Sequence, residues 1–311
     1  AILPLLGIGG RQMFKAETPG PMKDSKMTPR IAETAKGLWL VYLAVTVACV
    51  LSFRWAGMSW FDAVCHTFST MGLGGFSTHD ASFGYFNSPA IEGVAIVFML
   101  IAGMNFGTLF LAVSGRSLKP YRHDPEAVWF LGVTLLSIVV VAMYIWKDGV
   151  YPEFETALRH SAFNLVSIAT TTGYASVDYA LWPIFAPLWM LFLSSFATSA
   201  GSTGGGIKMI RALLLYKQVY RELSRAMHPN AVYNIRIGGQ VAPQPILFAV
   251  LGFAFMYMVS IVSLTLIMAF TGLDIISAFT AVVASINNTG PGLGVVGPST
   301  TYEALEDFQT W

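Results

Sequence analysis

The stretch FETALRHSAFNLVSIATTTGYASVDY (residues 154–179) decides the fold, because in it a short apolar run ends at small polar residues around a glycine. Two other segments have the same form, WFDAVCHTFSTMGLGGFSTHD (60–80) and LDIISAFTAVVASINNTGPGLG (273–294). About 20 apolar residues are needed to cross the hydrocarbon core of a bilayer, and the apolar part of each segment is shorter. Each segment therefore predicts a half-helix that stops inside a membrane.

The three segments align on one glycine. A serine stands six positions before that glycine in the first two segments (Ser69 and Ser167), whereas the third has Ala284 there and Ser285 beside it. A unit of spanning helix, half-helix, glycine tip and spanning helix thus appears twice in full, and a third time cut short at Trp311. The three tips are Leu73-Gly74-Gly75-Phe76, Thr171-Thr172-Gly173-Tyr174 and Asn288-Thr289-Gly290-Pro291.

The composition places these repeats in a membrane. Hydrophobic residues make up 55% of the 311 residues and charged residues only 11%, whereas soluble domains carry about 25% charged residues. The expected fold class is therefore an all-α integral membrane protein. The five candidate spans cover 37–53, 93–113, 127–146, 182–200 and 245–271.

The basic residues predict the orientation of these spans. Most of them precede the first span, follow the second, or lie between the fourth and fifth, and only Arg54, Lys147 and Arg159 remain for the other side. Because cytoplasmic loops carry an excess of Lys and Arg, the larger set is expected to be cytoplasmic. This set comprises Arg11, Lys15, Lys23, Lys26, Arg30, Lys36, Arg116, Lys119, Arg122, Lys208, Arg211, Lys217, Arg221, Arg225 and Arg236.

A glycine tip at membrane depth is typical of a cation pathway. Irregular backbone is tolerated there only where protein buries it or where it lines a water-filled cavity. A half-helix ends in unpaired carbonyls that carry a partial negative charge, so several such ends aimed at one point favour a cation. Backbone carbonyls can replace its hydration shell, and glycine permits the φ > 0 conformations that turn them toward one axis. Close packing of helices is the alternative role for these glycines, but it gives no reason for the same tip to follow a short helix three times.

The segment TSAGSTGGGIKMIR (198–211) contains a second glycine-rich run. A phosphate-binding loop would need a preceding strand and a hydroxyl after its lysine, whereas Lys208 is followed by Met209. We expect the run to break the fourth span in mid-membrane and to form a movable barrier, with a static kink as the alternative. Lys208 is expected to extend to the interface, with electrostatic competition against a cation in the cavity as the alternative. Asn105 in the second span is expected to form an interhelical hydrogen bond, with a position facing the pore as the alternative. The expected barrier consists of Gly201, Ser202, Thr203, Gly204, Gly205 and Gly206.

The GGFS, TTGY and NTGPG tips, together with TSAGSTGGGIK and the opening LPLLGIGGRQMFKAETPGP, resemble the Trk/Ktr/HKT superfamily of potassium transporters. The similarity covers essentially the whole chain and is greatest to bacterial subunits of the TrkH type. It implies potassium-channel-like repeats of helix, pore helix, filter and helix around one pore, with an intramembrane gate at residues 201–206. It implies K⁺ as the transported ion, no organic cofactor, and no catalytic residues, since the protein would not be an enzyme. The implied K⁺ filter, which binds through backbone carbonyls, consists of Leu73, Gly74, Gly75, Phe76, Thr171, Thr172, Gly173, Tyr174, Asn288, Thr289, Gly290 and Pro291.

The sequence departs from this family in one respect. Three filters are present where the family has four, so we expect a longer protein of which the first repeat and the last helix are missing here. The expected domains are 1–36, the end of a preceding membrane helix with a cytoplasmic loop; 37–123, the second pore repeat; 124–240, the third repeat with loop 201–206 and a cytoplasmic extension; and 241–311, the truncated fourth repeat.

The cytoplasmic stretch 208–240 is rich in basic residues, so its partners are expected to be anionic membrane lipid or an acidic protein surface. The resemblance implies a homodimer, a peripheral TrkA-type ring of nucleotide-binding regulatory domains, ion symport, and a multi-pass location in the bacterial inner membrane. No nucleic-acid partner is expected, because the basic patch adjoins spanning helices and lacks a nucleic-acid-binding motif.

Other functions remain as alternatives. A Na⁺-conducting or K⁺/Na⁺-conducting member of the same superfamily is the closest, because the first filter, which bears on this choice, is absent. A secondary carrier would show inverted or paired repeats, whereas these repeats run in the same sense. A membrane enzyme would need convergent catalytic groups, and the five histidines are scattered: His66, His79, His123, His160 and His228.

Overall fold

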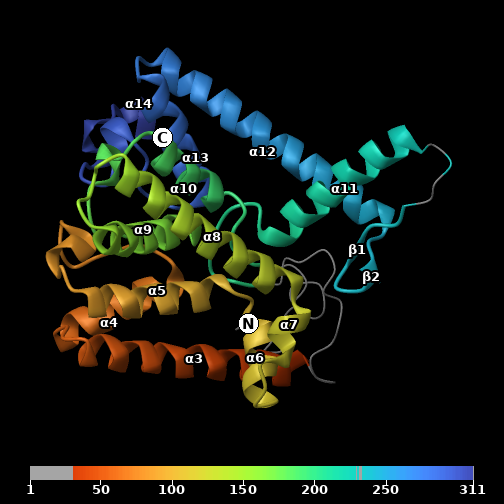
Figure 1. Ribbon diagram of the computed structural model, residues 1–311, viewed down its shortest axis with the longest axis horizontal. Helices are drawn as coiled ribbons and strands as arrows, with labels where there is room; N and C mark the ends of the chain where they lie inside the picture. Colours follow the sequence, from red (N-terminus) through yellow and green to blue (C-terminus); the bar gives the residue numbers. More distant parts are fainter. Residues whose placement is uncertain (1–30, 229, 231–232, 311) are drawn as a thin grey trace.

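The computed structural model describes residues 31–310 except 229, 231 and 232, so the opening motif and most of the expected domain 1–36 lie outside the described residues. The regular elements of the described chain are helices apart from one two-residue antiparallel ladder, β1 (Arg236–Ile237) with β2 (Gln240–Val241). In Figure 1, α3 lies at the bottom and α12 at the top. Between them, α3 contacts α4, α4 contacts α5, α5 contacts α9, α9 contacts α8 and α10, α10 contacts α13, and α13 contacts α12. The expected all-α membrane fold is confirmed, with the short ladder as an addition.

Three of the predicted spans are continuous helices. They are α3 (Ile31–Trp55), α8 (Pro125–Lys147) and α12 (Gln244–Phe270), each long and apolar enough to cross a membrane. Most of α12 is apolar around its whole circumference, and large side chains such as Phe248, Phe255 and Leu266 are exposed. Such a helix faces lipid, because water would not solvate it.

The second predicted span, 93–113, is not one helix. It consists of α5 (Pro89–Gly103) and α6 (Phe106–Ser114), which meet at a bend of 99°. The cause is Asn105, whose extended backbone and side-chain oxygen cap α6 by accepting the N–H groups of Gly107 and Thr108. The expectation of a continuous helix was therefore wrong at this position.

The fourth predicted span, 182–200, is also shorter than expected. Helix α10 (Phe185–Ser194) has only 10 residues, and irregular backbone follows up to α11 (Met209–Met227). The carbonyl of Ser195 accepts the N–H of Ile207, and the carbonyl of Thr198 accepts that of Met209. Because residues beyond the glycine run take these hydrogen bonds, the helix ends before that run rather than within it.

The three predicted half-helices are present as α4 (Trp60–Gly72), α9 (Phe154–Ala169) and α13 (Ile275–Asn287). Two start with side-chain caps: Ser59 accepts the N–H of Asp62, and Asp274 that of Ser277. Hydrogen bonds from Ser59 and Thr78 lower the pKa of Asp62, so the first turn of α4 carries a negative charge at the positive end of the helix dipole. The remaining short helices are η1 (Ser82–Tyr85), α7 (Lys119–His123), η2 (Tyr179–Leu181), η3 (Gly294–Val296), η4 (Tyr302–Ala304) and α14 (Asp307–Thr310).

Candidate functional site

The three glycine tips share one backbone conformation. In each, the aligned glycine and the residue two positions before it have positive φ, which is rare for a residue with a side chain. The recurrence of this unusual shape at the ends of α4, α9 and α13 indicates three copies of one structural unit. The φ values are 51° and 70° at Leu73 and Gly75, 61° and 90° at Thr171 and Gly173, and 57° and 98° at Asn288 and Gly290.

The tips also share one hydrogen bond to the preceding helix. The N–H of the residue before the glycine donates to the carbonyl of the residue six positions before the glycine, at 2.8 Å in all three copies. These bonds direct N–H groups of the tips back toward the helix ends and satisfy carbonyls that a helix terminus leaves unpaired. The donor and acceptor residues are Gly74 and Ser69, Thr172 and Ser167, and Thr289 and Ala284.

The three tips lie beside one another in chain order. A Cβ atom at Gly75 would overlap the carbonyl oxygen of Thr172, and one at Gly173 would overlap that of Thr289. A Cβ atom at Gly290 would have no neighbouring atom within 4 Å among the described residues. Each of the first two glycines thus contacts the carbonyl just before the next glycine, so the tips are neighbours in sequence order, with an open position beside Gly290.

Side chains of the tips differ more than their backbones. Tyr174 is fully buried, and its hydroxyl donates to the carbonyl of His66 at 3.2 Å and contacts the Thr70 hydroxyl at 3.2 Å, both on α4. Phe76, at the aligned position of the first tip, is 80% exposed. In the third tip, the Gly290 carbonyl accepts a hydrogen bond from Tyr302 at 2.6 Å. The second tip is therefore anchored to the preceding repeat, a contact that sequence analysis missed.

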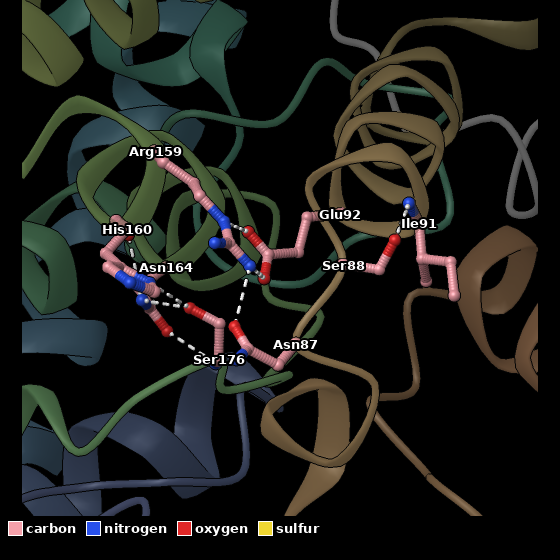
Figure 2. A network of polar contacts seen from close by, with 8 residues as sticks. All are labelled: Asn87, Ser88, Ile91, Glu92, Arg159, His160, Asn164 and Ser176. Carbon is pink, nitrogen blue, oxygen red and sulfur yellow. Dashed lines mark hydrogen bonds and ion pairs between the residues drawn. The ribbon is translucent and has the colours of Figure 1, made fainter. Parts of the chain in front are cut away.

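A polar network holds the second half-helix in place (Figure 2). Arg159 on α9 donates two hydrogen bonds to the carboxylate of Glu92 on α5, at 2.8 and 2.7 Å, and one to the side chain of Asn87. One helical turn further along, Asn164 accepts the N–H of Ser176 and donates to its hydroxyl. The half-helix is thereby fixed both to α5 and to the segment that follows its own tip.

The glycine-rich loop 201–206 lies against the ends of all three half-helices. The Thr203 hydroxyl donates to the carbonyl of Met71, the last turn of α4, at 3.0 Å. The Gly205 N–H donates to the side chain of Thr171 in the second tip at 2.7 Å, and a Cβ at Gly205 would overlap the carbonyl of Asn287 at the end of α13. The loop therefore contacts the tips on the side at which the half-helices end.

The bend between α5 and α6 supports the other side of this loop. The carbonyls of Ala102 and Gly103 accept the N–H groups of Thr203 and Ser199, and Phe106 donates its N–H to Gly201. The amide of Asn105 donates to the carbonyl of Ala200 at 2.5 Å. Asn105 therefore bonds to the loop, and the expected hydrogen bond between two helices was wrong.

Lys208 is turned toward the loop. Its side-chain ammonium donates to the carbonyl of Gly204 and to the hydroxyl of Ser202, and the residue is 8% exposed. The expectation that Lys208 extends to the membrane interface was therefore wrong. A positive charge in this position lies close to the ends of the half-helices, because Gly204 itself adjoins the carbonyl of Thr170.

Comparison with known proteins assigns a family to this arrangement. The model of the TrkH family, described as a cation transport protein, matches residues 1–306. The chain is 53% identical to the Trk system potassium uptake protein TrkH of Salmonella typhimurium over 312 residues, covering 100% of this chain and 64% of the relative. It is 52% identical to the Escherichia coli K12 protein of the same name, covering 97% of this chain and 62% of the relative.

A solved structure agrees with these similarities. The crystal structure of the potassium transporter TrkH from Vibrio parahaemolyticus superimposes with a TM-score of 0.85 at 45% sequence identity. The match covers 100% of this chain and 63% of the crystallised one. The chain thus spans less than two thirds of the length of the relatives that it matches.

Proposed function

Because the chain belongs to the TrkH family of cation transport proteins, we propose that it forms the larger part of a membrane subunit that moves K⁺ through a filter of backbone carbonyls. The observation that carries this proposal is the set of three neighbouring tips with the same pattern of positive φ, in which Gly75 adjoins Thr172 and Gly173 adjoins Thr289. The relatives named above are potassium uptake proteins.

The physical basis lies in the ends of the three half-helices. Placing a bare ion in a low-dielectric medium carries an idealised cost of order 20 kcal/mol, so oxygen atoms must replace its water shell. The helix ends supply carbonyls and the negative end of three dipoles, each of about half an elementary charge. The proposed filter residues are Leu73, Gly74, Gly75, Phe76, Thr171, Thr172, Gly173, Tyr174, Asn288, Thr289, Gly290 and Pro291.

The open position beside Gly290 supports a ring with one more member. Gly75 and Gly173 each adjoin a carbonyl of the following tip, whereas Gly290 has no such neighbour among the described residues. We place a fourth tip there, contributed by a part of the complete protein outside this chain. The longer relatives have room for such a repeat, since the chain covers 64% of the Salmonella protein.

We further propose that loop 201–206 is the gate of this pathway. It contacts the ends of α4, α9 and α13 together, and Lys208 brings a positive charge to the same place. A segment in this position obstructs an ion that has passed the tips. Because four of its six residues are glycines, few side chains hold it, and it can move without unfolding a helix.

The partners of the complete protein follow from its family and its charges. We propose a homodimer in the bacterial inner membrane with a cytoplasmic TrkA-type regulatory ring. The support on this chain is α11, which carries basic residues beside exposed apolar side chains such as Tyr216, Tyr220 and Leu223. Transport rather than catalysis is the proposed activity.

The test is ion flux through the complete protein in liposomes, comparing K⁺, Rb⁺ and Na⁺ in the parent and in Gly173→Ser. Gly173 has φ +90°, and a Cβ there would overlap the Thr289 carbonyl and lie 3.0 Å from Pro291 Cδ. The substitution should therefore reduce the preference for K⁺ over Na⁺. An unchanged preference would contradict the filter, and a parent that conducts Na⁺ as well as K⁺ would favour the alternative of a K⁺/Na⁺-conducting member.

A further inference from the structure

One buried carboxylate is hydrogen-bonded to both ends of the loop. Glu126, in the first turn of α8, is 1% exposed. Its Oε1 atom accepts the N–H of Ala200, immediately before loop 201–206, at 2.8 Å, and the N–H of Ile210, four residues after it, at 3.2 Å. A single oxygen atom thus fixes the entrance and the exit of the loop relative to each other.

The position of Ile210 explains why a carboxylate is suited to this place. Ile210 lies in the first turn of α11, where backbone N–H groups lack partners within the helix and the dipole is positive. The residue at the N-cap of α11, Lys208, forms no side-chain cap. Glu126 therefore caps α11 from another helix, and the positive charges of Lys208 and Arg211 act on it favourably.

The carboxylate is supported by elements that do not belong to the loop. The backbone N–H of Glu126 donates to Oδ1 of Asp124, the N-cap of α8, at 3.1 Å. The other oxygen of Asp124 accepts from Thr108 on α6 at 2.5 Å. Glu126 is therefore held on the junction of α6 and α8, which gives the loop a fixed reference.

We propose that Glu126 is the positioning residue that sets the closed state of the loop, and that displacement of α11 opens the loop by breaking the bond between Ile210 and Glu126. This inference rests on the proposed function. The bond to Ile210 is the longer of the two and lies at the start of α11, whose other end extends away from the rest of the helices (Figure 1). A force on the far end of α11 therefore reaches the loop through this bond.

The test measures resting flux of K⁺ and Rb⁺ in the complete protein without a regulatory partner, in four substituted forms. Glu126→Ala removes the acceptor and should raise resting flux by about tenfold or more, since hydrogen bonds to charged groups are the strong ones. Glu126→Asp keeps the charge, but its side chain is shorter by one methylene, so its oxygen atoms no longer reach the N–H groups. This variant should also raise resting flux. Glu126→Gln retains an acceptor of the right length and should raise it least. Asp148→Ala, which removes an exposed carboxylate at the opposite end of α8, is the control and should leave resting flux unchanged.

A second measurement separates loop position from folding. Ser202→Cys, in a background without other reactive cysteines, reports access to the loop from the cytoplasmic side with a membrane-impermeant maleimide. Labelling should be faster in combination with Glu126→Ala or Glu126→Asp than alone, and Glu126→Gln should change it least. If Glu126→Ala is poorly folded, the flux and labelling rate of Glu126→Asp decide the question, with Glu126→Gln as its reference.

Deletion of residues 202–205 distinguishes the two proposals. If the deletion raises resting flux but no Glu126 variant changes flux or labelling, the role of Glu126 is wrong and the gate stands. If the deletion itself leaves resting flux unchanged, the proposal that loop 201–206 is the gate is wrong. The proposed role of Glu126 is then wrong as well. Equal effects of Glu126→Gln and Glu126→Ala would overturn the claim that the acceptor atom holds the loop.

Discussion

The hydroxyl of Tyr174, in the second tip, donates a hydrogen bond to the backbone carbonyl of His66, on the half-helix of the preceding repeat, at 3.2 Å. Both residues are fully buried. The bond joins two repeats that are more than 100 residues apart in sequence. The spacing between neighbouring tips therefore depends on a side chain as well as on the backbone contact of Gly75 with Thr172.

Tyr174→Phe should weaken this junction without leaving a cavity. The variant leaves the His66 carbonyl without its tyrosine donor, and a lost buried hydrogen bond costs about 1 kcal/mol. We expect a lower unfolding temperature in detergent and a smaller flux ratio of K⁺ to Na⁺ in liposomes. The control is Tyr85→Phe, because Tyr85 is 61% exposed. If the flux ratio of K⁺ to Na⁺ is unchanged in Tyr174→Phe, the backbone contacts alone set the spacing of the tips.

Gly205→Ala should displace the loop from the half-helices. Its Cβ would overlap the carbonyl of Asn287, which belongs to the end of α13 and cannot move easily. Overpacking of this kind costs about 1–3 kcal/mol, so we expect resting Rb⁺ flux to rise. Gly252→Ala is the matched control, since Gly252 lies in α12 and, among the described residues beyond its own helical backbone, no atom lies within 4 Å of the added methyl group. If Gly205→Ala leaves resting flux at the parent level, the loop does not obstruct the pathway.

The ion pair of Arg159 with Glu92 should respond unequally to substitution of its two members. Glu92 keeps 3% of its side chain exposed, whereas Arg159 keeps 26%. Arg159→Met leaves a buried carboxylate without its cation, a change that costs about 3–5 kcal/mol in fully buried pairs and less where one partner reaches solvent. Glu92→Gln leaves an arginine that water can still reach, so it should cost less.

A double-mutant cycle of thermal unfolding measures this pair. The loss of unfolding free energy in the double variant Arg159→Met/Glu92→Gln should be smaller than the sum of the losses in the two single variants, because the partners are in direct contact. Additive losses would mean that Arg159 stabilises α9 through Asn87 instead, to which it also donates at 3.0 Å.

The half-helices and tips could be predicted from the sequence because they are local features. A short apolar run, a capping residue such as Asp274 and a glycine at a fixed distance determine their form within about 20 residues. The resemblance to the transporter superfamily was confirmed by the family match over residues 1–306. The positive φ values at Leu73 and Thr171 were not predictable, since neither residue type favours them.

The support of the loop could not be predicted, because it depends on contacts between distant residues. Glu126 follows Asp124 and Pro125 and has the pattern of an ordinary acidic first turn, whereas its partners are 74 and 84 residues away. The early end of α10 likewise results from Ile207 donating to the Ser195 carbonyl. In the second span, the GMNFG sequence was the available signal, since an asparagine between glycines within an apolar run favours a break.

Asn105→Asp should separate the two roles of Asn105. An aspartate keeps the oxygen that accepts the N–H groups of Gly107 and Thr108, so the cap of α6 remains. It loses the amide that donates to the Ala200 carbonyl and places a negative charge against that oxygen. We therefore expect raised resting flux with the cap of α6 retained, together with a lower unfolding temperature, because the new carboxylate is buried without a cation. Asn105→Ala removes both interactions, and should add a stability loss of about 0.5–2 kcal/mol, the usual cost of a lost cap. If Asn105→Asp conducts as the parent does while Asn105→Ala is destabilised, the residue serves only to cap α6, and the bend does not hold the loop.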